Sequence, residues 1–275
     1  MCPAAIGSQT VGSVGRPAAF CGIASIMPTQ QRISLRNVWP LAWSLDHVGM
    51  MGRSVADLEI MLDVMSESSV EKPVEKMEGR RVYRIGLIRE FFYNHATNEA
   101  RLLNEGLARR LAESGFQVEE VSLPAIFDVA NATVRTIIRS ETSSIHEKLF
   151  PPNRETYAPK IRAMVETGML VPAEDYVRAR RVRRKYQREM VRLFEKFDAL
   201  MTPAAPGTAP EGITTTGDPV MNAPWTLADF PTMTLPHAIG ANGLPISVQL
   251  SSPPLQEGLL LAVGKAVESV IGWKN

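Results

Sequence analysis

Residues 81–88, Arg-Val-Tyr-Arg-Ile-Gly-Leu-Ile, and residues 116–121, Phe-Gln-Val-Glu-Glu-Val, decide the fold class of this chain. We interpret both stretches as β-strands. The second alternates with period two, as a half-buried strand does. Between them, Asn98 to Ser114 has a helical pattern that ends at Gly115, a residue favoured just after a helix. A strand, a helix and a strand joined in this way form a parallel crossover, so the sequence predicts an α/β architecture.

Similar patterns lie on both sides of this unit. Ser54 and Asp57 are placed as in a capping box, which predicts a helix start at residue 54. We expect further helices over 125–150, 172–197 and 255–271, and strands at 4–6, 22–26, 198–203, 231–236 and 245–250. No repeat, low-complexity tract or shift in composition divides the chain, so residues 1–275 are expected to form one domain.

The composition is ordinary for a soluble globular protein, with 275 residues, 45% hydrophobic and 21% charged. The formal net charge of +1 provides no whole-chain attraction to nucleic acid or to an anionic membrane. The N-terminal residues do not have the pattern of a secretory signal, and two cysteines, Cys2 and Cys21, are too few for a disulfide framework or a structural zinc site. We therefore expect a cytoplasmic protein with no cofactor, no metal, and no nucleic-acid or membrane partner.

The stretch from Gly7 to Gly22 carries the candidate chemistry. Ser13 is expected in a glycine-containing loop, in which Gly12 and Gly15 permit close backbone approach and unusual dihedral angles. Successive backbone N–H groups in such a loop can converge on one point and form an oxyanion hole. A hydroxyl beside that hole is what acyl transfer requires, and the forked N–H groups of Arg16 can bind a substrate carboxylate or carbonyl.

Other interpretations of these residues compete. A tight turn containing an ordinary serine would have the same composition. The strand–turn–helix elbow of a Ser-His-Asp hydrolase needs a glycine two positions before the serine, where this chain has Val11. Ser69 and Lys72 match a bare S-x-x-K pattern without a companion motif. The arginine-rich segment 178–188 could bind nucleic acid, but a charged helix face is usually only solvated.

Several further motifs follow in a fixed order. They are Pro28-Thr29 with Arg32-Ile33-Ser34, residues 41–49 (Leu-Ala-Trp-Ser-Leu-Asp-His-Val-Gly), residues 197–203, Thr216-Gly217-Asp218-Pro219 with Asn222, Pro224-Trp225-Thr226, and Gly243-Leu244-Pro245-Ile246 with Gln249-Leu250. Together with residues 7–22, they resemble the amidase-signature family, including its malonamidase-like and amidotransferase-subunit-A-like amidases. The middle of the chain, residues 80–190, is compatible with the family without being diagnostic.

The resemblance implies a mixed β-sheet core flanked by helices, and hydrolysis of a linear small-molecule amide by a Ser-cisSer-Lys triad without a cofactor. By position, Ser13 is the nucleophile that becomes acylated. The oxyanion hole is expected from the backbone N–H groups of Thr10, Val11, Gly12 and Ser13. Arg16 matches an arginine that meets the substrate carboxylate in relatives acting on malonamate-like substrates, and Ser8 takes a position near the active site that is usually Thr.

Three features depart from the family pattern. Val11 replaces the first of two glycines, and valine tolerates positive φ poorly, so a distorted oxyanion hole is expected. Gln30-Gln31 stands where an aromatic-glycine pair is usual. The bridging serine and the lysine of relatives lie upstream of residue 1, so the resemblance implies an N-terminally truncated amidase-signature domain.

This last departure has a chemical consequence. A serine hydroxyl is a weak nucleophile without a base, so we expect the chain alone to be inactive and, with an open sheet edge, poorly soluble. A complementing N-terminal fragment or a second copy of the chain in a homodimer is the expected protein partner. The alternative function is a catalytically degenerate amidase-like subunit or interaction scaffold, which the valine at position 11 favours.

Overall fold

The computed structural model describes residues 2–67 and 82–273. The strands of this part of the chain form one sheet in the order β1-β3-β2-β7-β8-β6-β4-β5. They are β1 (Ala5–Gln9), β2 (Ala24–Met27), β3 (His47–Gly52), β4 (Arg84–Leu87), β5 (Gln117–Glu120), β6 (Ala199–Pro203), β7 (Thr232–Ile239) and β8 (Pro245–Ser251). Strand β4 pairs in parallel with β5 and β6, whereas the other pairs are antiparallel. The sheet is therefore mixed, and the predicted α/β class with its parallel crossover is confirmed.

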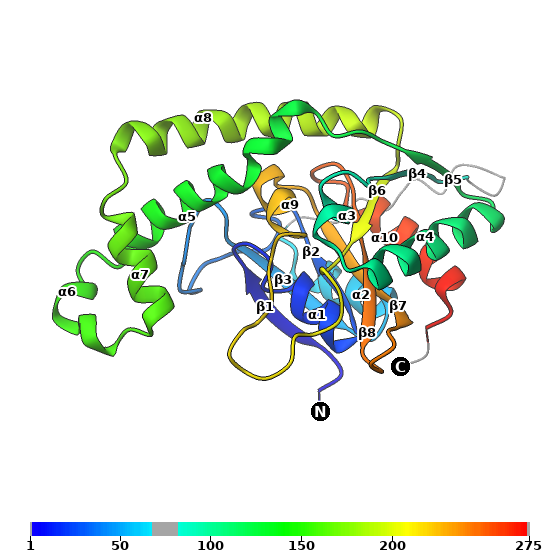
Figure 1. Ribbon diagram of the computed structural model, residues 1–275, viewed down its shortest axis with the longest axis horizontal. Helices are drawn as coiled ribbons and strands as arrows, with labels where there is room; N and C mark the ends of the chain where they lie inside the picture. Colours follow the sequence, from blue (N-terminus) through cyan, green and yellow to red (C-terminus); the bar gives the residue numbers. More distant parts are fainter. Residues whose placement is uncertain (1, 68–81, 274–275) are drawn as a thin grey trace.

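Helices cover both faces of this sheet (Figure 1). Helices α2 (Val55–Met65), α4 (Asn98–Glu113) and α10 (Glu257–Ile271) bury their apolar sides against one face. On the other face lie α1 (Gly15–Cys21) and α9 (Ala223–Ala228), and α5 (Ala130–Ile145) and α8 (Ala173–Met190) pack over α9. The shorter elements are α3 (Phe92–His95), η1 (Ala125–Val129), α6 (Phe150–Asn153), η2 (Arg154–Thr156), α7 (Pro159–Gly168) and η3 (Val191–Glu195).

The two faces of the sheet differ in polarity where α1 lies. Along β8, Val248 and Leu250 belong to the apolar cluster under α2, α4 and α10. Their neighbour Gln249 points to the opposite face, because successive side chains of a strand alternate. Gln249 and Thr234 of β7 are both buried there, close to the backbone of Gly15 at the start of α1. Helix α1 therefore rests on a polar surface that can bind its backbone through hydrogen bonds.

Several local predictions are confirmed. Ser54 caps α2, its side chain accepting the N–H of Asp57 while the Asp57 carboxylate accepts the N–H of Ser54. Helix α4 begins at Asn98 as expected. The long helix near residue 172 also forms, although Pro172 caps it instead of lying in its first turn. The S-x-x-K pattern starting at Ser69 lies outside the described residues.

Strand β3 and helix α1 were not predicted. Ser13 lies in a loop as expected, and this loop is a short turn between β1 and α1. Cys2 and Cys21 are both free and exposed. Within the described ranges, no helix has the length and apolar character that crossing a lipid bilayer would require.

Candidate active site

Ser13 lies in the turn that joins β1 to α1, two residues before the helix begins, and it is exposed. The ladder between β1 and β3 ends at Gln9, so the next residues leave the sheet. The backbone N–H groups of Thr10, Val11, Gly12 and Ser13 donate no hydrogen bond to another described residue. A run of unpaired donors beside an exposed hydroxyl can donate hydrogen bonds to an oxygen atom that gains negative charge during acyl transfer.

Close packing, not a positive φ, requires glycine at position 12 and leaves little room for a side chain at position 15. A Cβ atom at Gly12 would lie 2.7 Å from Asn222 Oδ1, and one at Gly15 would lie 3.2 Å from Thr234 Oγ1. Neither glycine adopts a positive φ, so the expectation of unusual dihedral angles is wrong for both. Val11 has no positive φ either, so the left-handed backbone that valine tolerates poorly does not occur there.

Gln9 fixes the turn to the sheet. Its side-chain oxygen Oε1 accepts the N–H groups of Val14 at 2.9 Å and of Gly15 at 3.0 Å. Its Nε2 donates to Thr226 Oγ1 at 3.2 Å, and Thr226 Oγ1 donates in turn to the carbonyl of Val11 at 3.0 Å. Because Gln9 is only 1% exposed, these bonds are made without competition from water. One buried carboxamide thus joins both ends of the turn to β1 and α9.

A buried carboxylate anchors the start of the turn. Thr10 Oγ1 donates to Asp46 Oδ1 at 2.6 Å. The other oxygen, Asp46 Oδ2, accepts the N–H groups of Leu41 at 2.9 Å and Ala42 at 3.0 Å. Three hydrogen bonds offset the cost of burying this charge, since Asp46 is almost fully buried. The turn is therefore coupled to the loop that precedes β3.

Two further carboxamides, those of Asn222 and Gln249, lie against the other side of the turn. Asn222 Nδ2 donates to Gln249 Oε1 at 2.8 Å and to the carbonyl of Ala204 at 3.2 Å. Gln249 Nε2 donates to the carbonyl of Met221 at 3.1 Å. Asn222 Oδ1 faces Gly12 and has no hydrogen-bond partner among the described residues. The motifs at 222 and 249 were visible in the sequence, but nothing there indicated that their side chains meet beside Ser13.

Arg16 lies in the first turn of α1 and is half-buried. Its Nη2 donates to Thr216 Oγ1 at 3.1 Å, while its Nε is buried and lacks a hydrogen-bond partner among the described residues. Burial lowers the pKa of the Arg16 guanidinium from its ordinary value, and the nearby Asp218 carboxylate opposes that shift. An arginine with an unused buried donor, three residues after Ser13, is suited to a carboxylate or carbonyl oxygen.

Ser8 and the histidines form no hydrogen bond with Ser13 within the described chain. Ser8 is exposed on the face of β1 opposite Gln9, so its hydroxyl and the Gln9 side chain point to different sides of the strand. The buried ring of His47 has Nδ1 at 2.6 Å from the Leu45 carbonyl and Nε2 at 3.2 Å from Asp229 Oδ1. Both nitrogens are thus engaged away from Ser13. In the described chain no imidazole or amine hydrogen-bonds the Ser13 hydroxyl.

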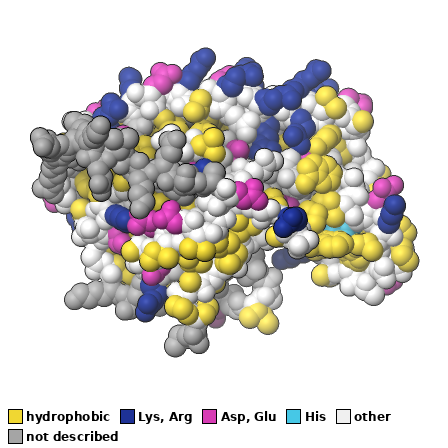
Figure 2. All heavy atoms as spheres, turned by 180° about the vertical axis from the view of Figure 1, so that it is seen from behind, with side chains coloured by type: hydrophobic (Ala, Val, Ile, Leu, Met, Phe, Trp, Pro, Cys, Tyr) yellow, Lys and Arg dark blue, Asp and Glu magenta, His cyan; other side chains and the backbone are white. Residues whose placement is uncertain are grey.

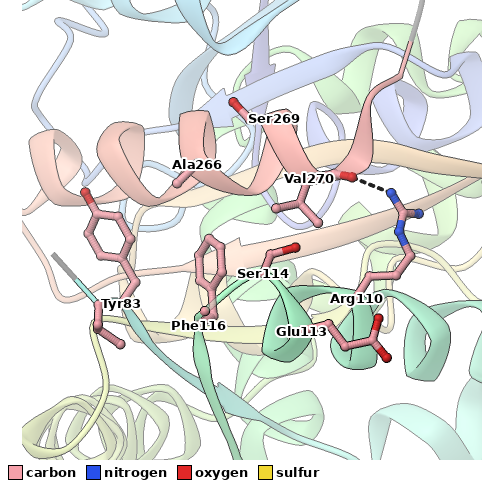
Figure 3. Close-up of a pocket in the computed structure, with 10 residues that line it drawn as sticks. Tyr83, Arg110, Glu113, Ser114, Phe116, Ala266, Ser269 and Val270 are labelled. Atoms are coloured by element: carbon pink, nitrogen blue, oxygen red, sulfur yellow. Dashed lines mark hydrogen bonds between the residues drawn. The ribbon is translucent and has the colours of Figure 1, made fainter. Parts of the chain in front are cut away.

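A separate pocket lies between α4 and α10, beside β5 (Figure 3). Tyr83, Phe116 and Arg110 line it, and Arg110 Nη2 donates to the carbonyls of Val270 and Ile271 at the end of α10. A cation at the C-terminus of a helix satisfies free carbonyl groups and stabilises the helix dipole. Arg110 has this structural role, and the pocket contains neither Ser13 nor Arg16.

The amidase family model matches residues 1–261. The chain belongs to the amidase family. An amidase of Pseudomonas putida is 29% identical over 297 residues, which cover 98% of this chain and 63% of that protein. The 1-carboxybiuret hydrolase subunit AtzE of Pseudomonas sp. (strain ADP) is 31% identical over an alignment that covers 97% of this chain and 62% of AtzE.

Solved amidase-family structures have the same fold. One described as a crystal structure of amidase superposes with a TM-score of 0.89 at 28% sequence identity, covering 97% of this chain and 62% of the other. The mixed sheet flanked by helices is therefore the amidase-family fold. This chain spans a little under two thirds of the length of these relatives.

Proposed function

We propose that the protein is a serine amidase that hydrolyses a small carboxamide through an acyl-enzyme on Ser13. The observation that carries the proposal is the exposed Ser13 hydroxyl beside four backbone N–H groups without hydrogen-bond partners in the described chain. Membership of the amidase family supports the same chemistry. Gln9, Asp46 and Asn222 hold the turn in place, so its donors are oriented before a substrate arrives.

The proposed reaction has two steps. The Ser13 oxygen bonds to the amide carbon, the carbonyl oxygen becomes negatively charged and receives the N–H groups of residues 10–13, and the C–N bond breaks as the amine takes up a proton. Water then attacks the acyl carbon and releases the carboxylic acid and the Ser13 hydroxyl. The hydroxyl needs a base to take its proton. That base must approach from the solvent side, because the serine is exposed and the turn packs against the protein below it.

Arg16 supports an acidic substrate. A carboxylate at the far end of a short amide can accept hydrogen bonds from the guanidinium. Hydrogen bonds between two charged groups are stronger than those between neutral groups. The loop containing Thr216 and Asp218 borders this position. We therefore propose a small acid amide of the malonamate type. Relatives named as subunits of a glutamyl-tRNA(Gln) amidotransferase and of a 1-carboxybiuret hydrolase support a protein that works in an assembly.

The test is ammonia release from malonamate and from a neutral amide, using the protein as its gene expresses it. Ser13→Ala is expected to lose about 10⁴-fold or more of the turnover, the scale seen when a serine hydrolase loses its nucleophile. Ser144→Ala, at an exposed serine on α5, is the matched control and keeps normal turnover. Arg16→Gln is expected to raise KM for malonamate and to leave the neutral amide unaffected.

Two results would count against this proposal. Normal turnover by Ser13→Ala would discard the nucleophile assignment. A wild-type protein that releases ammonia from none of a broad set of amides would favour the alternative, a degenerate amidase-like subunit or scaffold.

A further inference from the structure

Helix α8 carries an excess of positive charge, whereas the rest of the chain has no such excess. Residues 173–196, which include α8 and the turn after it, contain nine Lys or Arg and four Asp or Glu, although the whole chain has a net charge of +1. Two of these arginines point inward. Arg180 pairs with the buried Glu141 at 3.0 Å, and the buried Arg183 donates to the carbonyls of Leu227 and Ser44. These two have structural roles, whereas the remaining cations are exposed.

Exposed cations form a row along the outer side of α8. They are Arg178, Arg181, Lys185 and Arg188, with Arg192 in the following turn. The spacing of three or four residues places them on one face of the helix. Asp175 pairs with Arg178 at 3.4 Å and Glu189 with Lys185 at 3.5 Å, but Arg181, Arg188 and Arg192 form no ion pair with another described residue. Figure 2 shows Lys and Arg side chains along this edge of the molecule.

A groove between α5 and α8 borders this row. It has a volume of about 330 Å³, and its lining includes Ala132 of α5, Ala179 and Val182 of α8, and Leu170 from the turn before α8. Leu170 is 79% exposed, so an apolar side chain that entered the groove would remove it from water. Arg178, the first cation of the row, also lines the groove. The apolar groove and the cationic row are therefore parts of one surface.

The other rim of the groove is also cationic. Arg135 and Arg139 follow Ala132 by three and seven residues on α5, and both are exposed. This spacing places them on the side of α5 that carries Ala132. Residues 129–140 contain no Asp or Glu, and neither arginine is ion-paired to a residue that the structure describes. The groove, lined mainly by apolar side chains together with Thr133, Thr136 and Asp175, thus lies between two rows of cations.

We propose that this surface binds an acidic amphipathic helix of a partner protein. Such a helix places apolar residues at i, i+3 or i+4, and i+7 into a groove, while its carboxylates pair with arginines on both sides. A nucleic acid fits this surface less well. Its affinity comes from phosphate contacts, which leave an apolar groove unfilled and bring phosphates next to the Asp175 carboxylate in the lining. In Figure 1, α8 runs along the top of the molecule, away from β1 and α1, so a partner bound along α8 leaves Ser13 uncovered.

The experiment measures binding of labelled synthetic probes by fluorescence anisotropy. The first probe is a helical peptide as long as α8, with leucines on one face and glutamates elsewhere. The second has the same composition in scrambled order, and the third is a single-stranded RNA of equal charge. We expect the first peptide to bind saturably, at least about tenfold more tightly than the scrambled peptide, and more weakly as salt is raised.

Variants test both parts of the surface. The double variants Arg135→Glu with Arg139→Glu, and Arg181→Glu with Arg188→Glu, are each expected to raise the Kd of the first peptide about tenfold or more. Leu170→Ser is expected to raise the Kd of the first peptide as well, because it removes an apolar side chain from the groove. Arg36→Glu with Lys148→Glu reverses two exposed cations elsewhere and should leave the Kd unchanged. Circular dichroism checks that each variant stays folded.

Each opposing result overturns the proposal. Equal binding of the scrambled peptide would leave only non-specific charge attraction. RNA binding as tight as that of the first peptide would make this a nucleic-acid surface. Absence of binding by the first peptide, or equal weakening by the control variant, would remove the assignment altogether.

Discussion

Replacing Gln9 by leucine should reveal how strongly one carboxamide holds the turn that carries Ser13. The substitution keeps a buried side chain of similar size but removes the oxygen that accepts the N–H groups of Val14 and Gly15. Both residues are buried, so water cannot replace the lost acceptor. An orphaned buried donor costs about 1–3 kcal/mol, so two of them lower the free energy of unfolding by roughly 2–6 kcal/mol.

The assay is urea unfolding followed by circular dichroism, with thermal unfolding as a second measurement. A loss of this size lowers Tm by roughly 10 °C in a domain of this length. Gln117→Leu makes the same chemical change at an exposed strand position, and we expect it to leave the unfolding free energy nearly unchanged.

A Gln9→Leu protein within about 0.5 kcal/mol of the wild type would refute this reasoning, since changes of that size are ordinary for surface substitutions. It would mean that the N–H groups of Val14 and Gly15 find other acceptors when Gln9 is removed. The turn would then be held mainly by Thr10 and Asp46.

Two further changes test other parts of the chain. Gln31 adopts a φ of 65°, so Gln31→Gly should raise the unfolding free energy by about 0.5–1 kcal/mol in thermal unfolding, whereas Gln31→Ala should give no such gain. Burial, together with the charge of Arg110, lowers the pKa of His237 to about 4 from 6.5. The native state therefore resists protonation, and the stability due to the neutral ring is complete above about pH 6.5 and declines as the pH falls toward 4, by about 3 kcal/mol in all. His237→Leu should flatten this part of the pH profile, and an unchanged slope would contradict the assignment.

Much of the architecture could be predicted because its signals are local. The Ser54–Asp57 capping box and the crossover between β4 and β5 each depend on residues close together in the sequence. Helix α1 was missed because Gly12, Gly15 and Pro17 are typical of a turn. In the structure Gly15 and Pro17 lie within the helix, where a Cβ atom at position 15 would lie only 3.2 Å from Thr234 Oγ1. Tertiary packing thus outweighed local propensity at this position.

The candidate site also has a part that the sequence predicts and a part that it does not. The stretch around Ser13 could be located from the sequence, because the motif is contiguous and includes Arg16. Its supporting groups could not be assigned, because Asp46 and Gln249 come from strands and loops far away in the chain. The backbone of Val11 could not be predicted for a related reason, because φ depends on how the turn packs. Its φ is not positive in the structure, and the expected distortion of the oxyanion hole stays a prediction.

Strand β1 is the outermost strand of the described sheet, held by a ladder to β3 on one side, with Ile6 60% exposed. Peripheral segments of a protein open more often than its centre, and they do so without global unfolding. Detachment of this strand would carry the Ser13 turn with it while the clusters under α10 remain packed. Warming should therefore release the Ser13 turn at a lower temperature than the one at which the helices melt.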